Sequence, residues 1–203
     1  VSLRLAEVLL DQAAAAQGAH VQSVTPLVEE ALHLARRVAL HHVTAPRVQK
    51  RATRLEQRAL QALPGEERNR LQLLTPEDQL VRLRALLAAR EHEQTVDLAD
   101  ALLKPHRGRM RWPDAVCEIA LVRAKAVAGD KAYGRAVDSL TGVIPHCRDA
   151  DLLARARYLA GKYAANDGRH AQAVKLFTQL ERHHAEHRLA DDARLRAAYS
   201  YYR

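Results

Sequence analysis

Aromatic and isoleucine side chains are scarce in this sequence. Phe, Trp and Tyr make up 4% of the 203 residues, and isoleucine occurs only at Ile119 and Ile144. Because β-sheets favour β-branched and aromatic side chains on their pleated faces, this scarcity argues against a β fold. Alanine, leucine and arginine, all strong helix formers, are plentiful instead. We therefore expect an all-α protein.

Long apolar runs and known catalytic motifs are also missing. No run approaches the roughly 18 apolar residues of a membrane span. We find no phosphate-binding glycine loop, no metalloprotease helix and no Ser/His/Asp order. His183, His184 and His187 cluster, but across an expected turn, which does not suit a zinc site. We expect no catalytic residue, metal or cofactor in this chain, and hence no enzyme within it.

The two ends suggest a piece of a longer protein. The chain starts at Val1 without a basic leader, and the apolar-periodic segment Ala193–Arg203 ends without a cap or breaker. We expect a targeting segment or a further domain outside the sequence.

The net charge of +8 would attract an anionic partner. Acids and bases nevertheless interleave, as in Arg54-Leu55-Glu56, and no block of like charges or interleaved aromatics appears. This pattern indicates ordinary solvated helix faces and disfavours nucleic acid as a partner.

Apolar residues at helical spacing, interrupted by Pro and Gly, predict about ten helices. Thr25-Pro26 and Thr75-Pro76 each combine a capping residue with a first-turn proline, so both predict a helix start. We expect helical hairpins over residues 1–75, continuous with repeats over residues 76–203. The repeat region is expected to contain helices at about 76–90, 95–103, 112–129, 133–144, 149–166, 169–183 and from 189 onward.

The clearest repeat unit resembles a tetratricopeptide repeat. Gly161 stands where two antiparallel helices cross, Gly168 at their turn, and Ala173 and Phe177 supply the small and the aromatic residue of the returning helix. The physical logic is a small residue at the crossing and one ring that fills the gap. Residues 197–201 overlay residues 160–164 at a spacing of 37.

Looser units precede this one. Gly129 matches the turn glycine, with Ala136 and Leu140 as the small and large residues and a turn two residues longer. Ala99 and Leu103 take the same roles in a weaker unit without a turn glycine.

Leu189-Ala190-Asp191-Asp192-Ala193 and the end Tyr199–Arg203 narrow the resemblance. They are most similar to the superhelical, non-catalytic region of soluble lytic murein transglycosylases. This resemblance implies a right-handed superhelix of antiparallel helix pairs, in the periplasm, that guides peptidoglycan strands or docks proteins. The family's catalytic Glu-Ser pair is absent, so no catalytic residue is carried over. The alternatives are an envelope-assembly scaffold without an enzyme and the helical regulatory region of a transcription factor.

The first helix of each pair lines the inner surface of such an array. Its groove-facing positions would form a mostly basic strip for carboxylates of a peptide or glycan. Ordinary helix-surface charge is the alternative interpretation. The predicted strip consists of Arg84, Arg123, Arg155, Tyr158, Lys162 and Asn166.

Cys117 and Cys147 are the only cysteines. They lie roughly 20 and 25 Å from the turn near residue 130, at about 1.5 Å per residue, so they fall at nearly the same level of one hairpin. A disulfide would suit an oxidising compartment. Two thiols in an apolar interface are the alternative.

Overall fold

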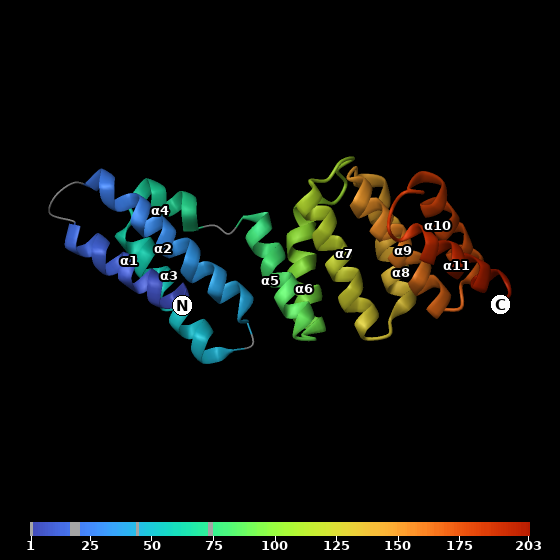
Figure 1. The fold of residues 1–203 in the computed structure, drawn as a ribbon, viewed down its shortest axis with the longest axis horizontal. Coiled ribbons are helices and arrows are strands. Elements are labelled where there is room, and N and C mark those ends of the chain that lie inside the picture. Colours follow the sequence, from blue (N-terminus) through green and yellow to red (C-terminus); the bar gives the residue numbers. More distant parts are fainter. Residues whose placement is uncertain (1, 17–20, 44, 73–74) are drawn as a thin grey trace. The chain divides into compact units, whose positions relative to one another are not determined.

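The computed structural model describes residues 2–16, 21–43, 45–72 and 75–203 (Figure 1). These residues contain eleven α-helices and no β-strand, so the predicted all-α class is confirmed. None of the described helices is long and apolar enough to span a membrane. The helices are α1 (Ser2–Ala16), α2 (Val21–His41), α3 (Pro46–Ala62), α4 (Gly65–Gln72), α5 (Pro76–Ala88), α6 (His92–Leu103), α7 (Asp114–Gly129), α8 (Tyr133–Val143), α9 (Ala150–Asn166), α10 (His170–His183) and α11 (Ala190–Tyr201).

The chain divides into two compact units, Val1–Ala85 and Leu86–Arg203. The boundary between these units falls within α5. In each unit a helix packs mainly against the next helix along the chain, from α1 to α3 and from α6 to α11. In the second unit α7 also touches α9, and α9 touches α11, so alternate helices share one side.

One of the two predicted helix-start signals is confirmed, and the other is wrong. Thr75 Oγ1 accepts a hydrogen bond from the Asp78 backbone N–H at 3.1 Å, and Asp78 Oδ2 accepts from the Thr75 N–H at 3.2 Å. This reciprocal cap fixes the start of α5 at Pro76, as predicted. The predicted start at Thr25-Pro26 is wrong, because α2 begins at Val21 and contains Pro26. Helix α4 was not predicted.

The first unit buries apolar side chains of α1, α2 and α3, and also one arginine. Val28 and Leu32 are completely buried, and Arg36 is only 3% exposed. The Arg36 guanidinium donates to Glu56 Oε1 at 2.9 Å and to the Leu71 carbonyl at 2.7 Å. Pairing and hydrogen bonding make the buried charge tolerable.

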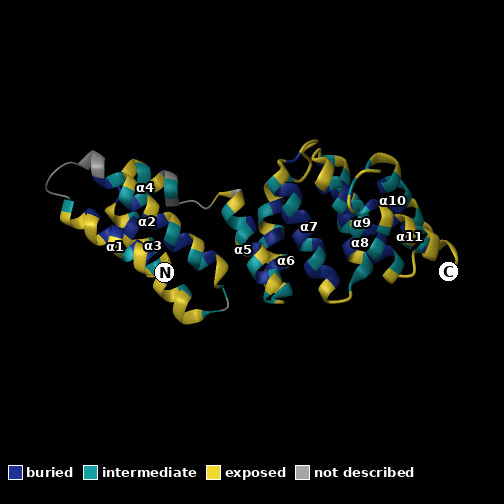
Figure 2. Ribbon diagram, viewed as in Figure 1, coloured by how far each residue is buried: buried dark blue, intermediate teal, exposed yellow. Residues whose placement is uncertain are grey.

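The core of the second unit confirms the expected contact between Gly161 and Phe177. Phe177 is fully buried, and a Cβ atom added to Gly161 would lie 2.7 Å from Phe177 Cε1. Only a glycine therefore lets α9 approach the ring. Figure 2 shows the buried residues running along α7, α8 and α9.

The turns correct the repeat register. Gly168 has φ = 77° and lies two residues before α10, and Lys131 has φ = 61° and lies two residues before α8. Lys131, and not Gly129, is therefore the equivalent of Gly168, and the predicted two-residue extension of this turn is wrong. Gly129 is instead the last residue of α7.

A residue with positive φ two positions before a helix also corrects the register of the weaker unit, by about one helical turn. Arg90 has φ = 63° and lies two residues before α6. Counted from Arg90, the positions of Ala173 and Phe177 are taken by Thr95 and Ala99. Both side chains are fully buried. The predicted pair Ala99 and Leu103 is therefore displaced by four residues.

Candidate functional site

Helix α9 presents four of the six predicted strip residues on one side. Arg155, Tyr158, Lys162 and Asn166 are three or four residues apart, which places them on the same face of a helix. We call these four residues the α9 face. Its neighbours are α7 and α11, the two helices that touch α9 on this side.

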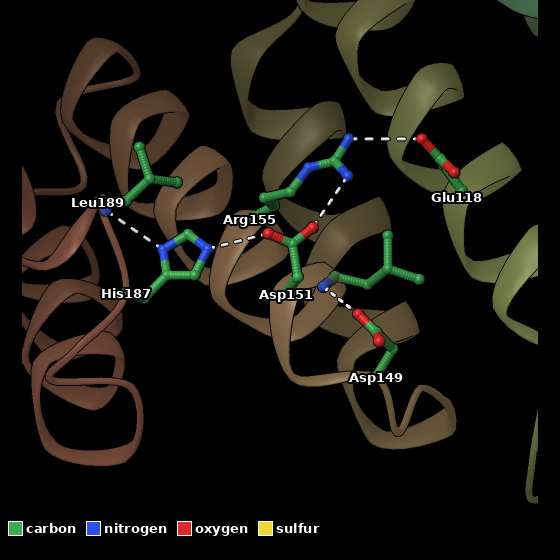
Figure 3. Close-up of polar contacts among 7 residues, drawn as sticks. Glu118, Asp149, Asp151, Arg155, His187 and Leu189 are labelled. Atoms are coloured by element: carbon green, nitrogen blue, oxygen red, sulfur yellow. Dashed lines mark hydrogen bonds and ion pairs between the residues drawn. The ribbon is translucent and has the colours of Figure 1, made fainter.

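Arg155 is held by carboxylates of two helices. Its guanidinium lies 3.5 Å from Glu118 Oε1 of α7 and 3.2 Å from Asp151 Oδ2, one turn earlier in α9 (Figure 3). The Arg155 side chain is 25% exposed. Two ion pairs at partial burial make this side chain a link between α7 and α9.

The network continues from Asp151 to the segment before α11 (Figure 3). His187 Nδ1 accepts a hydrogen bond from the Leu189 backbone N–H at 3.2 Å, so its proton resides on Nε2. That N–H donates to Asp151 Oδ1 at 3.1 Å. The hydrogen bond from His187, followed by that from Arg155, lowers the pKa of Asp151 below its usual value. Asp151 therefore stays ionised and joins α9 to the segment before α11.

Tyr158 makes a second link from α9 to α11. Its hydroxyl donates to Asp192 Oδ2, which also accepts from Arg196 Nε at 2.7 Å. The Arg196 guanidinium lies over the Tyr158 ring, 5.7 Å from its centroid. The hydrogen bonds from Tyr158 and Arg196 lower the pKa of Asp192, and burial raises the pKa of Tyr158. The tyrosine therefore remains a neutral donor to a carboxylate.

Lys162 and Asn166 differ from these linked residues. Among the described residues, neither makes a hydrogen bond or an ion pair. Lys162 is half-buried and Asn166 is exposed. The charge of Lys162 adds a small contribution to the lowered pKa of Asp192. These two side chains are the part of the α9 face that is free to meet a ligand.

Arg123 lies away from the α9 face. Its guanidinium binds both carboxylate oxygens of Asp100 in α6, at 3.1 and 3.0 Å, and donates to Ser139 Oγ of α8 at 3.2 Å. With Arg135 and Trp112 it lines a cavity of about 430 Å³. The structure therefore does not bring Arg123 and Arg155 into one strip.

The turn register explains this misplacement. From the sequence alone, Gly129 matches the turn glycine Gly168. Arg123 precedes Gly129 by six residues, just as Lys162 precedes Gly168 by six. Counted from Lys131, the equivalent residue is Lys125, which is half-buried. Two residues rotate a helical side chain by about 200°, which places Arg123 on another face.

Arg84 belongs to the first unit, so the structure does not relate it to the α9 face. It is exposed on α5.

Sequence reasoning missed the acidic partners Glu118 and Asp192. Glu118 lies 37 residues before Arg155, and Asp192 lies 37 residues after it. The spacing of 37 residues therefore carries a signal, because charges of opposite sign alternate at this spacing in α7, α9 and α11.

Cys117 and Cys147 form a disulfide in the structure, with their Cα atoms 5.9 Å apart. The Trp112 backbone N–H donates to the His146 carbonyl at 3.0 Å, and the two rings stack with centroids 5.0 Å apart. The open end of the α7–α8 hairpin is thus closed by a covalent bond and a stacked pair.

The remaining histidine cluster does not assemble a metal centre. Within the described ranges, no group of three or more His, Cys, Asp or Glu side chains could hold a metal ion. His184 Nε2 instead lies 2.5 Å from Arg157 NH1. Burial, followed by the Arg157 charge, lowers the pKa of His184, so a neutral imidazole accepts from the guanidinium.

Comparisons with protein families, with curated proteins and with solved structures found no match to this chain.

Proposed function

We propose that this chain is a non-catalytic helical scaffold whose repeat unit binds a protein or peptide through the α9 face. One observation carries the proposal. Glu118–Arg155 links α7 to α9, Tyr158–Asp192 links α9 to α11, and Asp151–His187 links α9 to the segment just before α11. These links stiffen a shared side while Lys162 and Asn166 stay unengaged, which is a suitable design for a preorganised binding surface.

The partner chemistry follows from the free groups. Lys162 offers an ammonium and Asn166 an amide, which suit a carboxylate or a backbone carbonyl of an extended acidic peptide. Arg155 and Arg123 of the predicted strip are less suitable, because both already form ion pairs with carboxylates of this chain.

The setting of this scaffold follows from the resemblance. We propose the non-catalytic superhelical region of a periplasmic lytic transglycosylase, in which the chain shapes or guides access to peptidoglycan. The Cys117–Cys147 disulfide supports this setting, because disulfides persist in oxidising compartments. An envelope-assembly scaffold without an enzyme is the alternative.

The experiment measures binding of a fluorescent acidic decapeptide, rich in Asp and Glu, by anisotropy. Lys162→Glu should weaken binding about tenfold, equivalent to about 1.4 kcal/mol for one charge-assisted contact. Lys175→Glu, at an exposed position of α10 without an ion pair, is the matched control and should change little. Equal binding of both variants and the unaltered protein would contradict the α9 face.

A second arm tests the setting. Purified peptidoglycan should retain the protein in a sedimentation assay, and Lys162→Glu should reduce the retained fraction. Retention of neither the protein nor its variants would favour the scaffold without an enzyme. Charge reversal at Arg155 is avoided, since it would break the links of Figure 3.

A further inference from the structure

Helix α3 gathers basic side chains on one face, which the linear sequence conceals. Its 17 residues contain five basic residues and a single acidic one, Glu56. Four of them recur at spacings of three or four residues, and the fifth, Lys50, directly precedes Arg51, so all five fall on one side of the helix. All five are exposed. They are Arg47, Lys50, Arg51, Arg54 and Arg58.

Two of the five are occupied by carboxylates of α1. Arg51 lies 2.7 Å from Glu7 Oε2, and Arg58 lies 2.9 Å from Asp11 Oδ1. These pairs fasten α3 to α1. Arg51, Arg58 and Glu7 also line a groove of about 580 Å³ in this unit, together with the other three basic side chains.

The other three are free. Arg47, Lys50 and Arg54 make no hydrogen bond or ion pair among the described residues. They recur about once per helical turn, at a pitch of about 5.4 Å. We call these three residues the α3 strip. It is a row of unneutralised positive charges along a groove, in contrast to Arg123 and Arg155, which are paired with carboxylates.

We propose that the α3 strip binds a linear phosphodiester polymer through its backbone charges. Guanidinium groups bind phosphate oxygens in a bidentate manner, and a regular row of cations matches a polymer with one charge per unit. No Phe, Tyr or Trp occurs before Trp112, so the unit lacks the large aromatic rings on which bases stack. Recognition is therefore independent of base sequence.

A membrane surface fits this strip less well. Surface-bound helices insert apolar side chains beside their basic residues. On α3, Thr53, Gln57 and Gln61 beside the strip are exposed and polar, and Val48 is the single exposed large apolar side chain of this helix. Anionic vesicles therefore serve as a comparison in the experiment.

The test measures anisotropy of a fluorescein-labelled mixed-sequence DNA duplex over a range of salt concentrations. Three phosphate contacts predict a slope of log K against log salt of about −2.7. Poly(glycerol phosphate) should compete with the duplex if its backbone is also recognised. Binding of either polymer supports the proposal and identifies the source of the phosphodiester. Absence of binding to both polymers would overturn it.

The decisive variant carries Arg47→Gln, Lys50→Gln and Arg54→Gln. Glutamine keeps helix propensity, and binding should fall by at least tenfold with a slope near zero. The control carries Arg135→Gln, Lys175→Gln and Arg188→Gln, exposed residues of the second unit without ion pairs. It loses the same net charge and should retain the slope.

The remaining outcomes are also decisive. If both triple variants lose binding equally, net charge and not the strip is responsible, and the proposal fails. It also fails if poly-glutamate or anionic vesicles bind as tightly as the phosphodiester polymers. If the triple variant does not fold by circular dichroism, Arg54→Gln alone should reduce the magnitude of the slope by about 1.

Discussion

The hairpins α7–α8 and α9–α10 place different residues at equivalent positions. Where they cross, the first hairpin has Ala124 and Leu140, both fully buried, and the second has Gly161 and Phe177. The larger residue of one helix is matched by the smaller residue of the other. The total side-chain volume at the crossing is therefore maintained while the individual side chains change.

The turns and open ends differ in the same way. Lys131 takes the left-handed turn position that Gly168 takes in the second hairpin. At the open end, Cys147 forms a disulfide, and the residue 37 positions later is His184, which pairs with Arg157. One hairpin is closed by oxidation and the other by a hydrogen bond.

The largest effect should come from removing the covalent closure. Replacing both Cys117 and Cys147 by Ala should lower the free energy of unfolding by about 3.5 kcal/mol, the entropic value for a loop of about 30 residues. Urea unfolding of the oxidised protein and the double variant measures it. A thiol reductant should lower the urea midpoint of the parent protein and leave the midpoint of the variant unchanged. A loss of unfolding free energy below about 1 kcal/mol in the variant would contradict the prediction.

The next largest effect should come from disturbing the crossing of α9 and α10. Gly161→Ala should cost about 2 kcal/mol, since the new Cβ would meet the Phe177 ring at 2.7 Å. Phe177→Leu in the same chain should recover part of this loss, because it recreates the Ala124–Leu140 combination. A double-mutant cycle by urea unfolding gives the coupling energy. Additive costs would show that the two side chains do not share one space.

The turn should give a smaller change of opposite sign in the two hairpins. Lys131→Gly should stabilise the protein by about 0.5 to 1 kcal/mol, because glycine adopts positive φ without steric cost. Gly168→Ala should destabilise it by about 1 kcal/mol for the same reason. Thermal unfolding of both variants tests the pair, and a destabilising Lys131→Gly would contradict the assignment of this turn.

The smallest effect concerns pH. The folded-state pKa of His184 lies below its unfolded value, so the unfolded chain binds the proton more readily. The stability from the neutral imidazole is complete above the unfolded pKa of about 6.5 and is lost as pH falls toward the folded value. The melting temperature should decrease between about pH 7 and 5, and His184→Gln should flatten this decrease. An unchanged profile in His184→Gln would refute the link.

Structural features could be predicted from the sequence where a single residue type is required at a position for one physical reason. A close helix crossing and a turn were predicted from Gly161, Phe177 and Gly168. A helix start was predicted from Thr75 and Pro76. Features could not be predicted where tertiary contacts outweigh the local conformational preference of a residue. Lys131 and Arg90 hold positive φ despite their side chains, so a register based on Gly129 selected Arg123 in place of Lys125. The α3 strip was missed because helical geometry collects charges that are separated along the chain.

The disulfide has a consequence for limited proteolysis. Lys131 is exposed at the tip of the turn, so trypsin can cleave after it. Cys117 and Cys147 lie on opposite sides of that bond, and the two fragments would stay covalently joined after the cut. The nicked chain would migrate as one band without reductant and separate into two with it, which maps the turn and the bridge in one gel.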